Sequence, residues 1–185
     1  MKNSKNEKVE NWIKEIHNIS EELNLVLGNF DSELLYKKPS PEKWSISQII
    51  EHIIKTNESY FSIPEQIKNG NYKLPAISKI PLIPKLFGKT ILSSVKPTNE
   101  RKVKTFPVWE PNLENKQNNI LNLILEHNKS LIDFLRNNVD LIEKETIISS
   151  PANKNIVYSF ETAIEILISH EQRHMNQIKE TLNLI

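Results

Sequence analysis

Apolar side chains recur every three or four residues along four stretches of this chain, the spacing that predicts amphipathic helices. The first stretch runs from about residue 5 to residue 30, and the second begins at Ser45 and ends before or near Gly70. The third spans residues 112 to about 137, and the fourth begins after Ser159 and closes the chain. Because no stretch alternates convincingly between apolar and polar residues, we expect an all-α protein built as a four-helix bundle.

Local signals mark several of the expected helix boundaries. Ser45 and Gln48 match a capping box, with Trp44 at the position of a hydrophobic staple. Pro64 falls inside the second helix, so we expect it to kink that helix or to end it early. Pro111 stands where a proline favours the start of the third helix.

The segment between the second and third helices, residues 71–111, differs from the rest of the chain. It holds six prolines, and it has eight lysines and arginines against two glutamates, so its local charge is +6. Its apolar residues indicate that it packs, with a short helix near residues 82–94. A crossover of this length can carry the chain back along the bundle, so that helices two and three run parallel. A solvated crossover and a functional lid explain its composition equally well.

Composition narrows the class of protein. A length of 185 residues favours one domain, residues 1–185, and the absence of cysteine excludes disulfides and a cysteine nucleophile and fits a reducing cytoplasm. The polar first ten residues show no signal peptide, and no apolar stretch approaches the ~20 residues that span a membrane, so we expect no membrane partner. With a net charge of +1, the chain has no overall electrostatic field that would attract nucleic acid. It contains only three glycines, and this scarcity argues against a glycine-rich phosphate loop.

Two histidines near the C-terminus, His170 and His174, are the strongest candidates for chemistry. Four residues apart on a helix, they lie on one face and one turn apart, where both can reach one metal ion. The run His170-Glu171-x-x-His174 also matches the zinc-protease pattern, but no histidine follows to supply the third ligand. We therefore expect that ligand upstream. His52 on the second helix is the best candidate, although a lone histidine at the edge of an apolar stripe is more often a surface residue.

Three further residues have more than one interpretation. Glu171 is either a proton acceptor beside the metal or a carboxylate that supports a ligand or lies at the surface. His127, inside the apolar stripe of the third helix, either shares the cavity of the other histidines or is a buried histidine bonded to a neighbour. Arg173 points away from the apolar stripe of its helix, so we expect it in solvent.

The chain resembles a known family over about residues 12–182. The residues that carry the resemblance are Trp44-Ser45-Ile46, Ile50 and His52, followed by His170-Glu171-x-Arg173-His174-x-x-Gln177-Ile178. In this order and helical setting they are similar to the DinB/YfiT-like superfamily (DinB_2), and the basic, proline-containing crossover resembles a subset of it. The resemblance implies a four-helix bundle, often up-down-down-up, with three histidines that bind a divalent ion such as nickel or zinc. Carried over position by position, the ligands are His52, His170 and His174, a set that also suits Co, Mn or Fe.

The resemblance implies two functions from different classes. The first is an enzyme acting on a small electrophilic substrate, because relatives include hydrolases and transferases that use a low-molecular-weight thiol such as bacillithiol. In that case the basic residues from Lys73 to Lys104 would bind the carboxylates of the thiol. The second is a non-catalytic, stress-related metal-binding module, for which a homodimer is one arrangement. Nucleic acid is a poor third partner, because the basic segment lacks interleaved aromatic residues.

Overall fold

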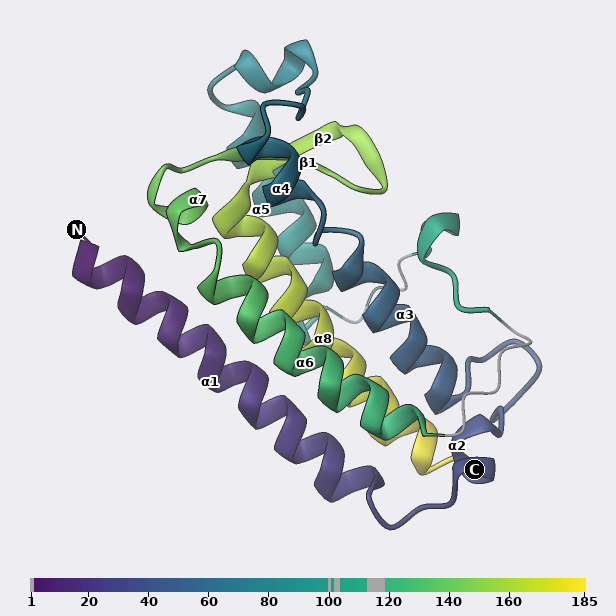
Figure 1. The fold of residues 1–185 in the computed structure, drawn as a ribbon. Coiled ribbons are helices and arrows are strands. Elements are labelled where there is room, and N and C mark those ends of the chain that lie inside the picture. Colours follow the sequence, from purple (N-terminus) through teal and green to yellow (C-terminus); the bar gives the residue numbers. More distant parts are fainter. Residues whose placement is uncertain (1, 100, 102–103, 113–118) are drawn as a thin grey trace.

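The computed structural model describes residues 2–99, 101, 104–112 and 119–185 of the chain. Four long helices, α1 (Lys2–Leu27), α3 (Ile46–Glu58), α6 (Ile120–Arg136) and α8 (Phe160–Leu182), lie side by side, and α1 and α3 each pack against both α6 and α8 (Figure 1). Their facing stripes form an apolar core in which Ile16, Ile50, Ile124 and Leu167 are fully buried. The mostly helical fold predicted from the apolar spacing is confirmed.

The second predicted helix is two helices in the structure. α3 begins with the predicted capping box: the Gln48 backbone N–H donates to Ser45 Oγ at 3.2 Å, and the Ser45 N–H donates to Gln48 Oε1 at 3.0 Å. After a turn, α4 (Ile63–Lys68) follows, with Pro64 in its first turn, where the missing N–H removes no helical hydrogen bond. Gly70, just past α4, has a φ of 70°, the left-handed conformation that ends many helices.

The third predicted helix starts later than expected. α6 begins at Ile120, and the side chain of Asn119 caps it by accepting from the Asn122 N–H at 3.1 Å. The predicted start at Pro111 is wrong, because residues 111 and 112 are irregular and the Asn112 N–H donates to Glu51 Oε1 of α3 at 3.1 Å. Residues 113–118 of the predicted helix lie outside the described residues.

A small sheet corrects the expectation that the chain has no strands. After α7 (Val139–Glu143), β1 (Ile147–Ser150) and β2 (Asn153–Ser159) pair as an antiparallel hairpin, with Ile148 opposite Tyr158. β1 contains Ile147 and Ile148, and β2 contains Ile156 and Val157, β-branched residues of the kind that favours strands. Each is too short to show a clear alternation in the sequence, and the register shifts between Ser149 and Ser150.

The crossover packs against the bundle. It contains η1 (Ala76–Lys79), α5 (Ile83–Val95) and η2 (Pro107–Trp109), so the short helix predicted near residues 82–94 is confirmed. α5 packs along α8 and β2. Gly88 permits this approach, because a Cβ there would lie 2.9 Å from Cγ2 of Thr162. Residues 100, 102 and 103, which the sequence counted in the basic segment, lie outside the described residues.

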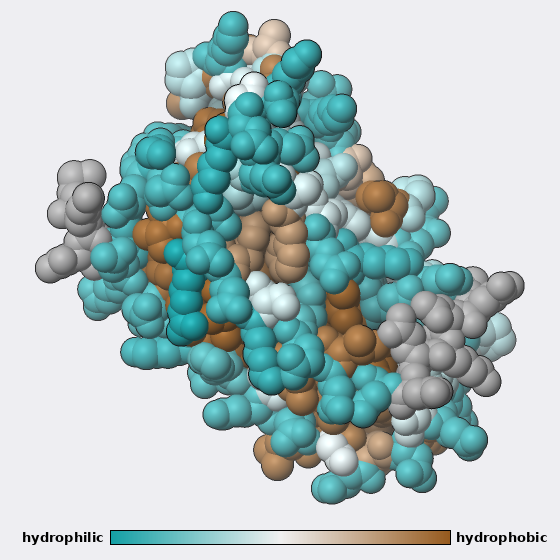
Figure 2. All heavy atoms as spheres, in the orientation of Figure 1, coloured by the Kyte–Doolittle hydropathy of each residue, from teal (hydrophilic) through white to brown (hydrophobic). Residues whose placement is uncertain are grey.

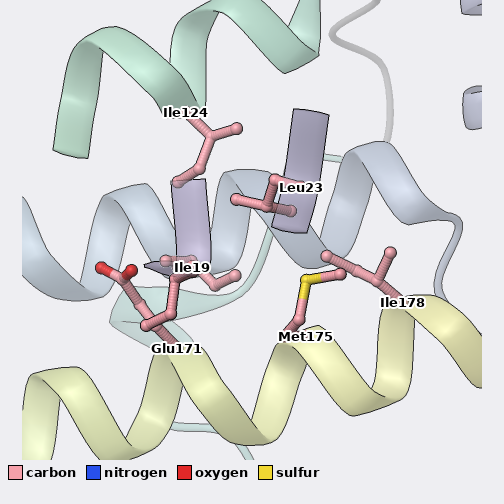
Figure 3. Close-up of a pocket in the computed structure, with 7 residues that line it drawn as sticks. Ile19, Leu23, Ile124, Glu171, Met175 and Ile178 are labelled. Atoms are coloured by element: carbon pink, nitrogen blue, oxygen red, sulfur yellow. The ribbon is translucent and has the colours of Figure 1, made fainter. Parts of the chain in front are cut away.

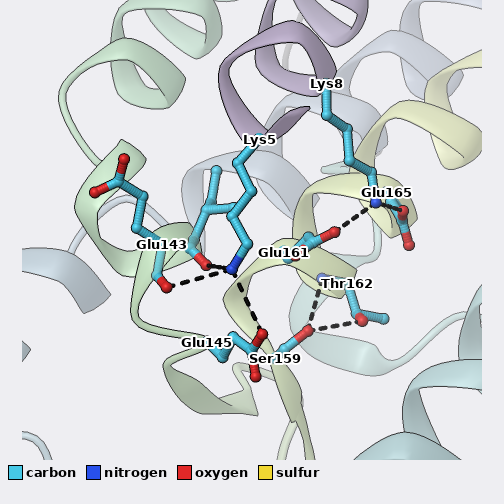
Figure 4. Close-up of polar contacts among 9 residues, drawn as sticks. Lys5, Lys8, Glu143, Glu145, Ser159, Glu161, Thr162 and Glu165 are labelled. Carbon is cyan, nitrogen blue, oxygen red and sulfur yellow. Dashed lines mark hydrogen bonds and ion pairs between the residues drawn. The ribbon is translucent and has the colours of Figure 1, made fainter. Parts of the chain in front are cut away.

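Polar contacts hold the N-terminal end of α1 to the rest of the bundle (Figure 4). Lys5 Nζ donates to the carbonyls of Ile142 and Glu143, at 3.0 and 3.3 Å, where a positive charge at the C-terminal end of α7 is favourable. Lys8 Nζ pairs with Glu161 and Glu165 at the start of α8. At the other end, between α1 and α3, lies the short α2 (Ser32–Tyr36).

The outer surface is mainly hydrophilic on the face drawn in Figure 2, with apolar groups showing between the helices. Within the described part of the chain, no helix is both long enough and apolar enough to span a membrane.

Candidate metal centre

Three histidines from two helices meet in the structure: His52 of α3, and His170 and His174 of α8. The Nε2 atom of His170 lies 3.1 Å from Nε2 of His52 and 2.9 Å from Nε2 of His174. One nitrogen from each ring lies within 4.8 Å of the others. Three tetrahedral ligands at a Zn–N bond of about 2.1 Å would stand about 3.4 Å apart. The structure therefore brings the three histidines to a spacing that one divalent ion can bridge, and it buries His52, at 4% exposure.

The hydrogen bonds of Nδ1 in His52 and in His174 show that the Nε2 atom of each ring faces the other histidines as an acceptor. His52 Nδ1 lies 2.8 Å from the carbonyl oxygen of Trp109, and His174 Nδ1 lies 2.7 Å from Oε1 of Gln177. Because these oxygens accept, each Nδ1 carries the proton and each Nε2 presents a lone pair. A single proton on His170 Nε2 can match one of these lone pairs but not both. The three Nε2 atoms therefore form a set of electron-pair donors that suits a cation.

Burial keeps these imidazoles neutral. It lowers the pKa of His174 to about 3, with the neighbouring His52 charge as a further cause. It lowers the pKa of His170 well below its ordinary value and also lowers that of His52. Neutral imidazole is the form that binds a metal, so the cluster needs no deprotonation at neutral pH.

Glu171 extends into the interior of the bundle, where it lines a pocket (Figure 3). It is 1% exposed, so a surface position is excluded. The pocket that it lines is too tight for a water molecule and is otherwise apolar, with side chains Ile19, Leu23, Ile53, Ile124, Met175 and Ile178. Asn57 Nδ2 donates to Glu171 Oε1 at 2.6 Å. Burial nevertheless dominates and raises the pKa of Glu171 to about 7.

His127 contacts Asn57 and is not part of the cluster of His52, His170 and His174. Its Nε2 lies 3.1 Å from Asn57 Nδ2, and its ring stacks on Phe61 at a centroid distance of 5.7 Å. Burial lowers the pKa of His127 to about 4. Of the two interpretations, the structure favours a buried histidine bonded to a neighbour.

This burial of His127 predicts an acid-labile fold. In the unfolded chain the pKa is near 6.5, and in the fold it is about 4, so between these pH values the unfolded state binds more protons. The unfolding free energy should fall by up to about 3 kcal/mol as the pH drops from 6.5 to 4. Glu58 Oε1 lies 3.9 Å from His127 Nδ1 and is largely exposed, so it offsets little of this loss of stability.

Urea unfolding at pH 7.5 and 4.5 measures this effect as the difference between the wild type and His127→Gln, in which the contribution of the other histidines cancels. The variant should lose less stability on acidification, because glutamine keeps an acceptor for Asn57 and does not titrate. Identical losses in the two proteins would show that His127 is protonated in the fold at little cost.

Arg173 corrects a prediction. The sequence placed it in solvent, but its Nη1 donates to the Ser94 carbonyl at 2.6 Å and its Nη2 to the Arg101 carbonyl at 2.7 Å. The expectation is wrong because the face of α8 that carries Arg173 is covered by the crossover, which a helical wheel of α8 alone does not show.

Two residues of the site were missed by the sequence analysis. Asn57 is fully buried and joins Glu171 to His127. Its signal was a polar side chain close to the apolar stripe of α3 and five residues after His52. Trp109 contacts His52 through a backbone carbonyl. Nothing in the local sequence marks that contact, since it depends on the path of the crossover.

Comparisons with known proteins give a family and a fold. Residues 15–178 match the model of the DinB superfamily. One solved structure is described as YfiT from Bacillus subtilis, a probable metal-dependent hydrolase with an unusual four-helix bundle topology. It matches with a TM-score of 0.52 and 14% identity, over 95% of this chain and 86% of that chain. At this identity the likeness shows the fold alone. A search of curated proteins found no match.

Proposed function

Because the chain belongs to the DinB superfamily, we propose that it binds one divalent metal ion and uses it in hydrolysis of a small electrophilic substrate. The observation that carries this proposal is the histidine cluster: the Nε2 atoms of His52, His170 and His174 converge, and a single proton on His170 cannot match the lone pairs of both other rings. The YfiT description as a probable metal-dependent hydrolase supports the reaction class.

The proposed ligands also fit an open coordination position. Three imidazoles suit Zn, Ni, Mn, Fe or Co and leave room for one more group. A bound ion would lower the pKa of water or of a thiol, which supplies a nucleophile at neutral pH.

We further propose Glu171 as the proton acceptor. A pKa of about 7 is close to the ideal for a general base at neutral pH. Its carboxylate lies in the interior of the bundle and is bonded to Asn57, so this role requires the side chain to turn toward the ion. The competing role is support, in which the Asn57–Glu171 hydrogen bond joins α3 to α8 and thereby sets the distance between His52 and the other two histidines.

A more specific version of the proposal is transfer of a low-molecular-weight thiol, bacillithiol or a relative of it. Gly88 of α5 contacts Thr162, which is about 12 Å along α8 from His170 at 1.5 Å per residue. The basic residues of the crossover up to Lys89 therefore lie far from the cluster. Because the carbonyls of Ser94 and Arg101 meet Arg173, Lys96 and Arg101 lie near the level of the histidines, and Lys104 follows them in the chain. We propose these three for the carboxylates of the thiol.

The second candidate function is a non-catalytic metal-binding module, monomeric or homodimeric. The burial of His52 and His174, at 4% and 8% exposure, favours it, because structural metal sites are closed to solvent. Both candidates keep the same ligands and differ in whether a substrate reaches the ion.

The proposal includes the organisation of the chain as one domain, residues 1–185, with helices in up-down-down-up order. Contacts at the two ends of the bundle support that order. Lys5 near the start of α1 meets Ile142, after α6, and Lys8 meets Glu161 at the start of α8. Lys37, between α1 and α3, donates to the Ile185 carbonyl after α8 at 2.9 Å. A cytoplasmic location also stays a prediction.

Metal reconstitution tests the function. Protein purified without an affinity tag and stripped with chelator should show no turnover. One equivalent of Zn, Ni or Mn should restore it to at least about tenfold above buffer on activated esters and amides, because the bound ion supplies the nucleophile. The same protein with bacillithiol and a haloarene or epoxide tests thiol transfer. Stoichiometric metal binding with no turnover on either panel favours the binding module, and no metal binding overturns both candidates.

A further inference from the structure

The last part of the crossover, residues 104–112, lies across α3 at His52, and we call it the strap. Polar contacts attach it to α3 over two helical turns. The Trp109 carbonyl lies 2.8 Å from His52 Nδ1, and the Trp109 indole Nε1–H donates to Ser59 Oγ at 3.1 Å. Lys55 Nζ donates to the Glu110 carbonyl at 3.0 Å. The strap is therefore held on the same helix that supplies one of the proposed ligands.

Trp109 is the central contact of the strap. Its indole is partly buried against the core, and the ring of Phe106 packs against it edge-on at a centroid distance of 5.6 Å. Val108, the residue before it, is 61% exposed. The indole thus fixes the position of the backbone carbonyl that meets His52.

We propose that Trp109 is a positioning residue for metal binding, and that docking of the strap and binding of an ion at the histidine cluster stabilise each other. The inference rests on the proposed metal site. The Trp109 carbonyl holds the proton of His52 on Nδ1 and fixes the ring, so that Nε2 stays free and aimed at His170.

Reciprocity follows from thermodynamic linkage. If a docked strap raises the affinity of the cluster for an ion by some factor, the ion stabilises the docked strap by the same factor. An ion bound at Nε2 also withdraws charge from the ring, which makes the Nδ1–H a stronger donor to the Trp109 carbonyl. The contact is therefore expected to tighten on metal binding.

Trp109→Ala and Val108→Ala are the matched pair that tests this. Both shorten an apolar side chain of the strap, but only the first removes the anchor to Ser59. Chelator-competition titration with Zn²⁺ should show about tenfold to hundredfold weaker binding for Trp109→Ala, the range for groups that orient a ligand. Val108→Ala should stay within about twofold of the wild type. The absorption spectrum of bound Co²⁺ should change in Trp109→Ala alone, which a general loss of stability would not produce.

Hydrogen exchange measures the reverse direction in the wild type. The amides of Phe106, Val108, Trp109 and Glu110 should exchange more slowly with Zn²⁺ than without it. Ser59→Ala leaves the indole in place as a packing group, which guards against misfolding, and should weaken Zn²⁺ binding by a smaller factor than Trp109→Ala. If the wild type binds one Zn²⁺ but Trp109→Ala matches Val108→Ala, or strap exchange ignores Zn²⁺, the coupling is wrong and the metal site stands. If the wild type binds no Zn²⁺, both fail.

Discussion

Replacing His170 by alanine is expected to abolish stoichiometric binding of a divalent ion. His170 Nε2 lies between the other two, 3.1 Å from His52 and 2.9 Å from His174, so its loss leaves two imidazoles that do not enclose an ion. The affinity should fall by more than the roughly tenfold to hundredfold that changes around a ligand cost. Metal analysis of tag-free protein after dialysis, followed by competition titration, measures the effect.

His127→Ala is the matched control for this experiment. His127 is also a buried histidine, at 6% exposure, but it pairs with Asn57 and lies outside the cluster. The His127→Ala variant should therefore keep one equivalent of metal. His52→Ala should behave like His170→Ala, because it removes the ligand that α3 supplies. Equal metal content in wild type, His170→Ala and His52→Ala would place any ion elsewhere on the protein.

The second large effect is expected from Glu171→Gln, which keeps the shape of the side chain and removes its charge. If Glu171 accepts a proton in the reaction, the rate should fall by about a hundredfold to ten-thousandfold with the metal content unchanged. If it serves as a support, the rate should change little, because glutamine can still accept from Asn57.

The same variant should gain stability at neutral and higher pH. The pKa of Glu171 is raised from 4.5 to about 7 by burial, so between these values the folded state binds the extra proton. This carboxyl therefore costs the fold stability as the pH rises from 4.5 to 7, by up to about 3 kcal/mol. Urea unfolding at pH 8 should show a more stable Glu171→Gln, and the gain should vanish near pH 4.5.

Glu180→Gln is the control on the same helix, since Glu180 is exposed and its change should leave rate and stability near those of the wild type. A Glu171→Gln variant with the same pH dependence as Glu180→Gln would show that the buried carboxylate is ionised in the fold at no cost. Full activity in Glu171→Gln would end its assignment as proton acceptor.

Local sequence features were enough to predict the four long helices and the short helix of the crossover, but not the short helices α2 and α7. The spacing of apolar residues follows the 3.6-residue turn, and the capping box at Ser45 and Gln48 joins groups three residues apart. Their physical causes act within one or two turns of helix, so no tertiary contact is needed to recognise them. The same holds for the shared face of His170 and His174, which the helix alone dictates.

Elements without such local causes were missed or misplaced. The hairpin at residues 147–159 is stabilised by pairing across strands and by packing on α5, and neither leaves a mark in such short runs. The third helix begins at Ile120, and Pro111 does not start a helix, because the Asn112 N–H donates to Glu51 of α3. In both cases a non-local contact overrode the local preference.

The sequence by itself determined a helical protein with a histidine pair on one face of its last helix. Tertiary structure decided the rest: that His52 meets this pair, that Arg173 binds the crossover, and that Glu171 faces an apolar interior. The physical reason is one of range. Helix periodicity and capping are set by neighbours in the chain, whereas burial and the partner of each side chain are set by how separate helices pack.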